Sequence, residues 1–183
     1  MAFPISCLMT KNLLKSNNCS YTLNEITDIY VADFNSVSAA NVDYSCESGV
    51  TVTGISATST GKVFSHIEVA KNSASYSDEL VVEDSGAKYR THTVTFGIPG
   101  NYNKDIVCSI DTLALGRFFV VVQTAAGEYL ALGRTAGLEA SEQSIAGGGD
   151  TNGVTVTLTA NVAESAIPLN TDAVAQMKEL VFA

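Results

Sequence analysis

Strict alternation of apolar and hydroxyl side chains is the feature of this sequence that most restricts its fold. In the segment GVTVTLTA, Val154, Val156 and Leu158 alternate with threonines, and a period of two places these apolar residues on one face of a strand. The segment KYRTHTVTFGI repeats the pattern, with Val94 and Phe96 on one face and threonines on the other. Both segments therefore predict half-buried strands of an antiparallel sheet.

Further strands are expected in short runs rich in Val, Ile, Thr or Tyr and bounded by Gly, Asn, Ser or Asp. These runs are residues 26–32, 50–55, 62–70 and 79–83. The segment RFFVVVQTAAGEYLALG predicts a hairpin with its turn at residues 125–127. Its first arm, residues 118–122, is apolar on both faces and is expected in the middle of the sheet. This strand content predicts a mainly β fold, an antiparallel β-sandwich or barrel with long loop or hairpin extensions.

One short α-helix is expected in NKDIVCSIDTLALG, where Ile106, Ile110 and Leu113 recur at helical spacing. Gly116 follows at the position of a left-handed C-terminal cap. The tail TDAVAQMKELVFA suits a helix or a strand, and the extended form is preferred because the rest of the chain is so rich in strand signals.

Two stretches, residues 36–48 and 133–153, predict loops, and GISATSTGKVF predicts a hairpin turn. Neither loop has the length of a linker between two cores, so residues 1–183 are expected to form a single β-rich domain.

Charge and composition restrict the partners. The 10 Lys and Arg against 19 Asp and Glu give a formal charge of −9, which does not suit stable binding to nucleic-acid phosphates. The N-terminus lacks a secretory signal pattern, and no apolar run approaches the roughly 20 residues that span a bilayer. We therefore expect a soluble protein made in the cytoplasm. The cysteines lack the paired spacing of a zinc site and are expected to be reduced and buried: Cys7, Cys19, Cys46 and Cys108.

No residue pattern predicts catalysis. Both histidines, His66 and His92, fall in strand segments in phase with phenylalanines, and are expected to be partly covered strand residues or cross-strand partners. The acidic group Glu79, Glu83 and Asp84 is expected to be solvated rather than paired for acid–base chemistry. The sequence therefore predicts no enzyme, no cofactor and no metal site.

Residues 88–98 and 154–160 carry little of the Lys, Pro or inward-pointing charge that protects sheet edges. Either loops of the same chain cover these edges, or identical copies pair with them and build a ring or tube. The second interpretation places inter-subunit contacts on a long hairpin around residues 73–99 and on a glycine-rich loop around residues 146–153. The residues expected to make them are Ser75, Tyr76, Val94, Phe96, Gly148, Asp150 and Asn152.

Four segments carry a resemblance to a known class of proteins: EITDIYVADFNSV, SASYSDELVVEDSGAKYRTHTVTFGIPG, LALGRFFVVVQTAAGEYLALGRTAGLEA and DTNGVTVTLTANVAESAIPL. Their order of strands, hairpins and one helix resembles that of small virion structural proteins of tailed bacteriophages, most of all the major tail tube protein. The resemblance implies a β-sandwich or barrel with one flanking helix, assembled into stacked hexameric rings around a lumen lined by acidic groups.

On this resemblance, the chain would be a non-enzymatic subunit of the virion tail, with copies of itself and other virion proteins as partners and no membrane contact. A charge of −9 suits a channel wall that repels DNA phosphates, so contact with viral DNA would be transient and non-adhesive. Two alternatives stay open. One is an auxiliary capsid or head-to-tail connector protein, and the other is a small β-sandwich binding or adhesin module.

Overall fold

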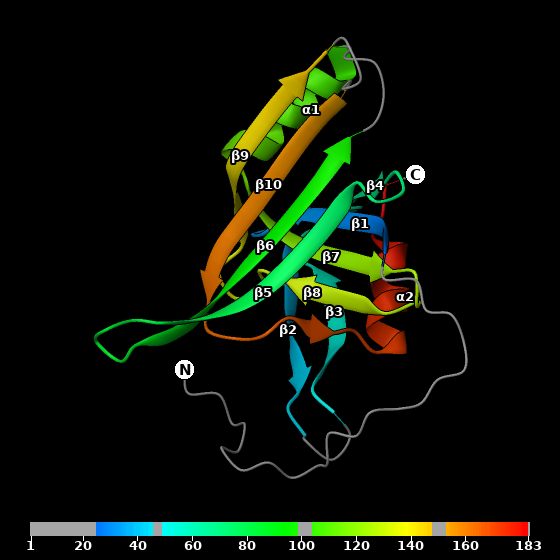
Figure 1. Cartoon of the computed structure of the whole chain (residues 1–183). Coiled ribbons are helices and arrows are strands. Elements are labelled where there is room, and N and C mark those ends of the chain that lie inside the picture. The colour runs from blue at the N-terminus through cyan, green and yellow to red at the C-terminus, as the bar shows by residue number, and fades with distance from the viewer. Residues whose placement is uncertain (1–24, 46–48, 99–103, 148–152, 183) are drawn as a thin grey trace, which may run out of the picture.

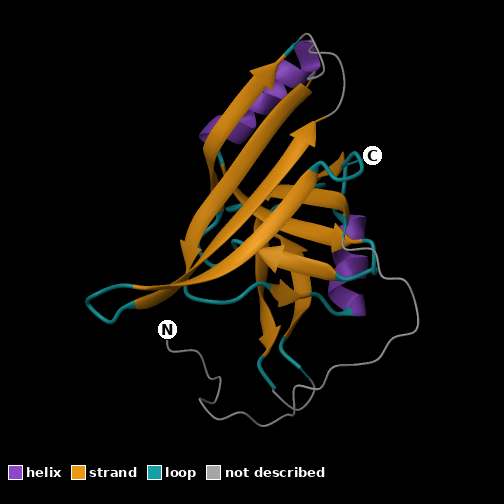
Figure 2. Ribbon diagram, viewed as in Figure 1, coloured by secondary structure: helices purple, strands orange, loops and turns teal. Residues whose placement is uncertain are grey.

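The computed structural model describes residues 25–45, 49–98, 104–147 and 153–182. Figures 1 and 2 show a mainly β molecule with antiparallel sheets and two helices among these residues, so the predicted fold class is confirmed. The elements, in chain order, are β1 (Ile26–Asp33), β2 (Val37–Asp43), β3 (Thr51–Ala57), β4 (Phe64–Glu68), β5 (Ala74–Val82), β6 (Lys88–Ile98), α1 (Lys104–Leu115), β7 (Arg117–Thr124), β8 (Tyr129–Leu132), β9 (Leu138–Ala146), β10 (Gly153–Val162), β11 (Ile167–Pro168) and α2 (Thr171–Glu179).

Four long strands form the first layer, in the order β9, β10, β6, β5, and run side by side in Figure 1. We call this layer the long sheet. The alternation in the sequence sets its two faces, because Val94 pairs with Leu158 and Phe96 with Val156, and all four side chains are fully buried. The threonines between them lie on the opposite face, as predicted.

The second layer contains β4, β1, β7 and β8, with β7 between β1 and β8. It joins the long sheet where Phe118 of β7 pairs with Leu138 of β9. The predicted central position of β7 is confirmed, because both of its faces are covered. Val120 belongs to the core beneath the long sheet, and Val121 belongs to a second core on the other side.

The second core is closed by the β2–β3 hairpin and by α2. The prediction of an extended tail is wrong, because residues 171–179 form a helix. The side-chain oxygen of Asn170 accepts a hydrogen bond from the Ala173 N–H at 2.8 Å and caps the helix. Ala173 and Met177 lie four residues apart and are fully buried, so one face of the helix covers the core.

Three local predictions are also wrong. Residues 36–48 contain β2 and residues 133–153 contain β9, so neither stretch is only a loop. The segment GISATSTGKVF is not a hairpin turn, because β3 pairs with β2 while β4 pairs with β1. The helix before Gly116 is confirmed, but Gly116 has no positive φ. A Cβ there would lie 2.3 Å from Cζ of Phe118, so a close approach requires the glycine.

The predicted open edges are wrong as well. β6 lies between β10 and β5, and β10 lies between β9 and β6, so both strands are inside the sheet. Cys108 is the one cysteine within the described residues; it is free, as predicted, but exposed rather than buried. Neither described helix has the length and apolar character needed to cross a bilayer.

Candidate functional site

The edge of the long sheet is formed by β5, which pairs with β6 and with no other strand in the described chain. The Gly97 N–H donates to the Ser73 carbonyl at 3.0 Å, which fixes the phase of this antiparallel ladder. Along a strand, the main-chain N–H and C=O groups of every second residue point to the same side. The main-chain groups of Ser75 therefore face β6, whereas those of Tyr76 and Leu80 point away from β6, out of the sheet. In this outward row the Asp78 carbonyl accepts from Nη2 of Arg90 at 3.3 Å, and the groups of Tyr76 and Leu80 are available to another strand.

The opposite edge is formed by β9. This strand pairs with β10 along its length but with β7 only at Leu138 and Glu139. From Ala140 to Ala146, its outer side therefore has no strand partner within the described residues. Because the long sheet has four antiparallel strands, β5 and β9 run in opposite directions. The β5 edge of one copy and the β9 edge of the next are therefore suited to antiparallel pairing in a head-to-tail arrangement.

Exposed apolar side chains gather at these two edges. In the part of the chain that the structure describes, six large hydrophobic side chains are exposed, and four of them lie on β5 or β9: Tyr76, Leu80, Val82 and Ile145. The strand register places all four on the face that also carries Val94 and Phe96. An apolar margin of this kind indicates a surface that is covered by a partner.

The other face of the long sheet is polar and has almost no positive charge. Hydroxyl pairs follow β6 and β10: Thr95 lies 3.1 Å from Thr157 and Thr93 lies 3.3 Å from Thr159. The register adds three carboxylates to this face, Glu79, Glu139 and Glu142. The four strands contribute no Lys or Arg to this polar face. Their two basic residues are Lys88 and Arg90, and the strand register places both on the apolar face. Arg117 of β7 pairs with Glu139 at 3.0 Å.

A partly buried ionic cluster lies behind the β5 edge. Asp78 accepts hydrogen bonds from Nε of Arg90 at 2.5 Å and from the Ala166 N–H at 2.9 Å. Burial raises the pKa of the Asp78 carboxyl, but these hydrogen bonds outweigh it and hold the pKa below its usual value. The cluster fastens the edge strand β5 to the chain segment that follows β10.

His92 lies beside this cluster as a cross-strand partner of Asp78, which is one of its two predicted roles, but it is fully buried rather than partly covered. Its Nδ1 accepts from the Gly133 N–H at 3.2 Å, so the proton of the neutral ring is on Nε2, 3.5 Å from Oδ1 of Asp78. Burial lowers the pKa of His92 and keeps the ring uncharged at neutral pH. The arrangement holds structural elements together and offers no exposed base for catalysis.

His66, in contrast, lies on the surface of β4. Its Nε2 is 2.7 Å from Oδ1 of Asp28, and its ring stacks on Tyr30 with the ring centres 4.9 Å apart. Burial, with smaller contributions from Tyr129 and Asp28, raises the pKa of Tyr30 to about 12, so the phenol keeps its proton. His66 is thus a cross-strand partner of Tyr30, as the sequence predicts.

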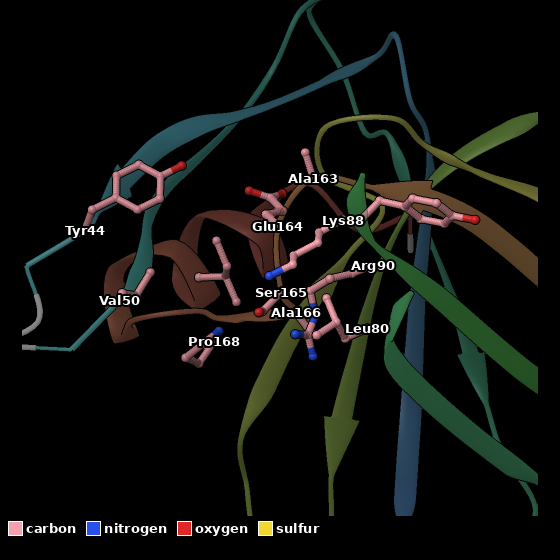
Figure 3. A pocket seen from close by; sticks show the side chains of 12 residues that line it. Tyr44, Val50, Leu80, Lys88, Arg90, Ala163, Glu164, Ser165, Ala166 and Pro168 are labelled. Carbon is pink, nitrogen blue, oxygen red and sulfur yellow. The ribbon is translucent and has the colours of Figure 1, made fainter. Parts of the chain in front are cut away.

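A hollow of about 400 Å³ lies under the β5 edge (Figure 3). The β5–β6 hairpin contributes Leu80 and Arg90 to its lining. The connection between β10 and β11 contributes Ala163 and Ala166, and β11 contributes Pro168. The hollow is on the apolar side of the long sheet, because Leu80 and Arg90 are register partners on that face. Within the described residues, no group of side chains could hold a metal ion.

The predicted contact residues differ in their accessibility. Ser75 and Tyr76 are exposed on the β5 edge, where a neighbour has access to them. Val94 and Phe96 are wrong as contact residues, because both side chains are fully buried beneath the long sheet. Gly148, Asp150 and Asn152 lie outside the described residues. Sequence reasoning missed Leu80 and Val82, although apolar residues in the polar segment SYSDELVVED were the available signal.

No protein-family model, curated protein or solved structure matches this chain.

Proposed function

We propose that the chain is a non-enzymatic structural subunit that joins edge to edge into rings, and that the rings stack into the tail tube of a tailed bacteriophage. The observation that carries this proposal is the pair of antiparallel edges of the long sheet that lack a strand partner within the described residues, with three exposed large apolar side chains on β5 and one, Ile145, on β9. Pairing of β5 with the β9 of a neighbour repeats the same contact in every copy, and such heterologous contacts form a ring when the rotation from one copy to the next closes.

Six copies would give a continuous barrel of about 24 strands, because each long sheet contributes four. With strands about 4.8 Å apart, such a barrel is at least about 37 Å wide between backbones, and wider when its strands tilt. The second layer would lie outside the barrel, because it covers the apolar face of the long sheet, and α2 would lie farther out, because it covers the second core on the other side of that layer. The threonine-rich face would then line the lumen.

The chemistry of this face supports the passage of DNA. Hydroxyl groups are neutral, and the carboxylates of Glu79 and Glu142 repel phosphates, whereas Glu139 is paired with Arg117. The four strands contribute no Lys or Arg to this wall, and the Arg117 guanidinium beside it is paired with Glu139. DNA therefore finds few free cations to replace its condensed counterions, which is the main source of non-specific affinity. DNA would therefore pass through the lumen without adhering to it.

Electron microscopy of the purified chain at increasing concentration tests the proposal. Six-fold rings or stacked tubes are the expected result. Twelve-fold rings or icosahedral shells would instead favour the connector or capsid alternative. A chain that stays monomeric at millimolar concentration would contradict assembly altogether, and a binding module would then be the better interpretation.

A further inference from the structure

Leu115 is the most exposed large hydrophobic residue in the described chain, with 90% of its surface accessible. It ends α1, whose Ile110 and Leu113 pack into the core beneath the long sheet. α1 therefore lies on the apolar side of that sheet. Leu115 is only two residues before Arg117, the strand partner of Glu139, so it lies next to the beginning of β9.

The hollow beneath Leu80 lies on the same side of the long sheet, at the opposite edge. Both β5 and β9 are nine residues long. β7 already occupies the outer side of β9 at Leu138 and Glu139, so a neighbour has residues 140–146 to pair with. If these residues pair antiparallel with residues 74–80 of β5, Ala140 in one copy lies beside Leu80 in the next. This pairing brings Leu115 of one copy to the part of the neighbour where Leu80 borders the hollow.

We propose that Leu115 inserts into this hollow of the adjacent copy and locks the ring laterally, an inference that rests on the proposed ring assembly. The occupant is thus a second copy of the same chain. Pro168, Ala163 and Ala166 supply apolar walls, and about 400 Å³ is ample space for one leucine side chain. The contact would cover two exposed leucines, Leu80 and Leu115, that the isolated chain leaves in water.

Charges at the two surfaces are complementary. Asp111 lies one turn before Leu115, so the two side chains project from the same face of α1. Asp111 is exposed and forms no ion pair within the described residues. Lys88 borders the hollow and is likewise exposed and unpaired in the part of the chain that the structure describes. Insertion of Leu115 would bring this acid and this base together and fix the register of the two strands.

Concentration-dependent assembly, measured by sedimentation velocity and electron microscopy, tests the inference. Leu115→Lys should raise the concentration needed for half-maximal assembly at least about tenfold, because it removes one buried leucine and places a charge in the hollow. Asp111→Lys and Lys88→Asp should each weaken assembly, and the double variant should restore it. Asp172→Lys, with the same charge change on α2, is the matched control and should assemble like the wild type.

The outcomes separate this inference from the proposed function. If the wild type forms rings and Leu115→Lys forms them equally well, the Leu115 contact is wrong while the ring proposal stands. Single charge variants that impair assembly without recovery in the double variant would also overturn the contact. If the wild type forms no rings, both proposals fall. Leu115 is too exposed to support the fold, and unchanged thermal unfolding of each variant would show that any loss of assembly is not a loss of folding.

Discussion

Arg134 and Glu164 form a bidentate ion pair in which the carboxylate is almost wholly buried. Nε of Arg134 donates to Oε1 of Glu164 at 2.9 Å, and Nη2 donates to Oε2. The same guanidinium also donates to the Ala39 carbonyl at 3.2 Å and to the Tyr44 hydroxyl at 3.0 Å. One side chain thus connects the turn between β8 and β9, the end of β10 and the β2–β3 hairpin.

Removal of the Arg134 guanidinium should therefore destabilise the folded chain. Arg134→Met leaves the buried Glu164 carboxylate without a partner and should lower the free energy of unfolding by about 3–5 kcal/mol. Arg117→Met is the control, since the Arg117–Glu139 pair is more than half exposed and such pairs contribute less than about 1 kcal/mol. Urea unfolding of both variants measures the difference, and equal losses would contradict a structural role for the buried pair.

The pH dependence of stability should be dominated by loss in acid. The pKa of His92 is lowered in the folded state, so below about pH 6.5 the unfolded chain binds more protons and stability falls as the pH falls. Asp78 acts in the same direction at lower pH, because its folded pKa lies below its usual value of 3.8. Each pH unit within the His92 range costs up to about 1.4 kcal/mol.

Replacement of the buried ring tests this dependence. His92→Gln is expected to be less stable than the wild type at pH 7.5 but to lose less on transfer to pH 5.5. The measurement is the urea midpoint at the two pH values, with the slope of the transition as a check on two-state unfolding. A wild type equally stable at both pH values would show that His92 is not the acid-sensitive group.

Two glycines of similar backbone conformation should differ in their tolerance of a side chain. Gly127 and Gly133 both have positive φ, at 87° and 69°. A Cβ at Gly127 would meet nothing within 4 Å, whereas one at Gly133 would lie 3.0 Å from the Leu138 main-chain nitrogen. Gly127→Ala should cost about 1 kcal/mol, from backbone strain alone, and Gly133→Ala clearly more. Thermal unfolding of the two variants compares the costs directly, and a smaller loss at Gly133 would contradict the contact.

Local patterns in the sequence predicted the elements whose two faces differ. The alternation around Val94 and Leu158 led to β6 and β10, and the apolar run of β7 led to its central position. Strand order was not predictable, because nothing in an alternating segment says which segment lies beside it. The sequence therefore predicts open edges at β6 and β10, although β5 and β9 occupy the edges. α2 was missed because the packing that buries Met177 against the second core is a long-range effect.

The β5 edge itself is open to a direct test. Leu80→Lys puts a charge on the exposed apolar margin, which should disfavour pairing with another strand and abolish ring formation while leaving the monomer folded. Ser85→Lys adds the same charge in the turn of the same hairpin and should still assemble. Electron microscopy and circular dichroism of both variants provide the readouts. Assembly of Leu80→Lys at the wild-type concentration would remove β5 from the interface.

The polar face of the long sheet leads to a prediction about DNA. Thr155 is exposed on this face and pairs with Gly97, so a longer side chain at this position meets no side chain on β6. In a ring, Thr155→Lys would place one cation per copy in the lumen, where each phosphate contact steepens the salt dependence of DNA binding by about 0.9 in log–log slope. Tubes of this variant should retain short duplex DNA at low salt and release it at high salt.

A cation outside the barrel should behave differently. Ala175→Lys adds the same charge on an exposed position of α2, which covers the second core and would lie on the outer surface of the tube. DNA retained inside the lumen of Thr155→Lys tubes should be protected from added nuclease, whereas DNA bound to Ala175→Lys tubes should be digested. Nuclease protection therefore distinguishes a lumenal face from an outer one, and equal digestion in both variants would place the threonine face outside the channel.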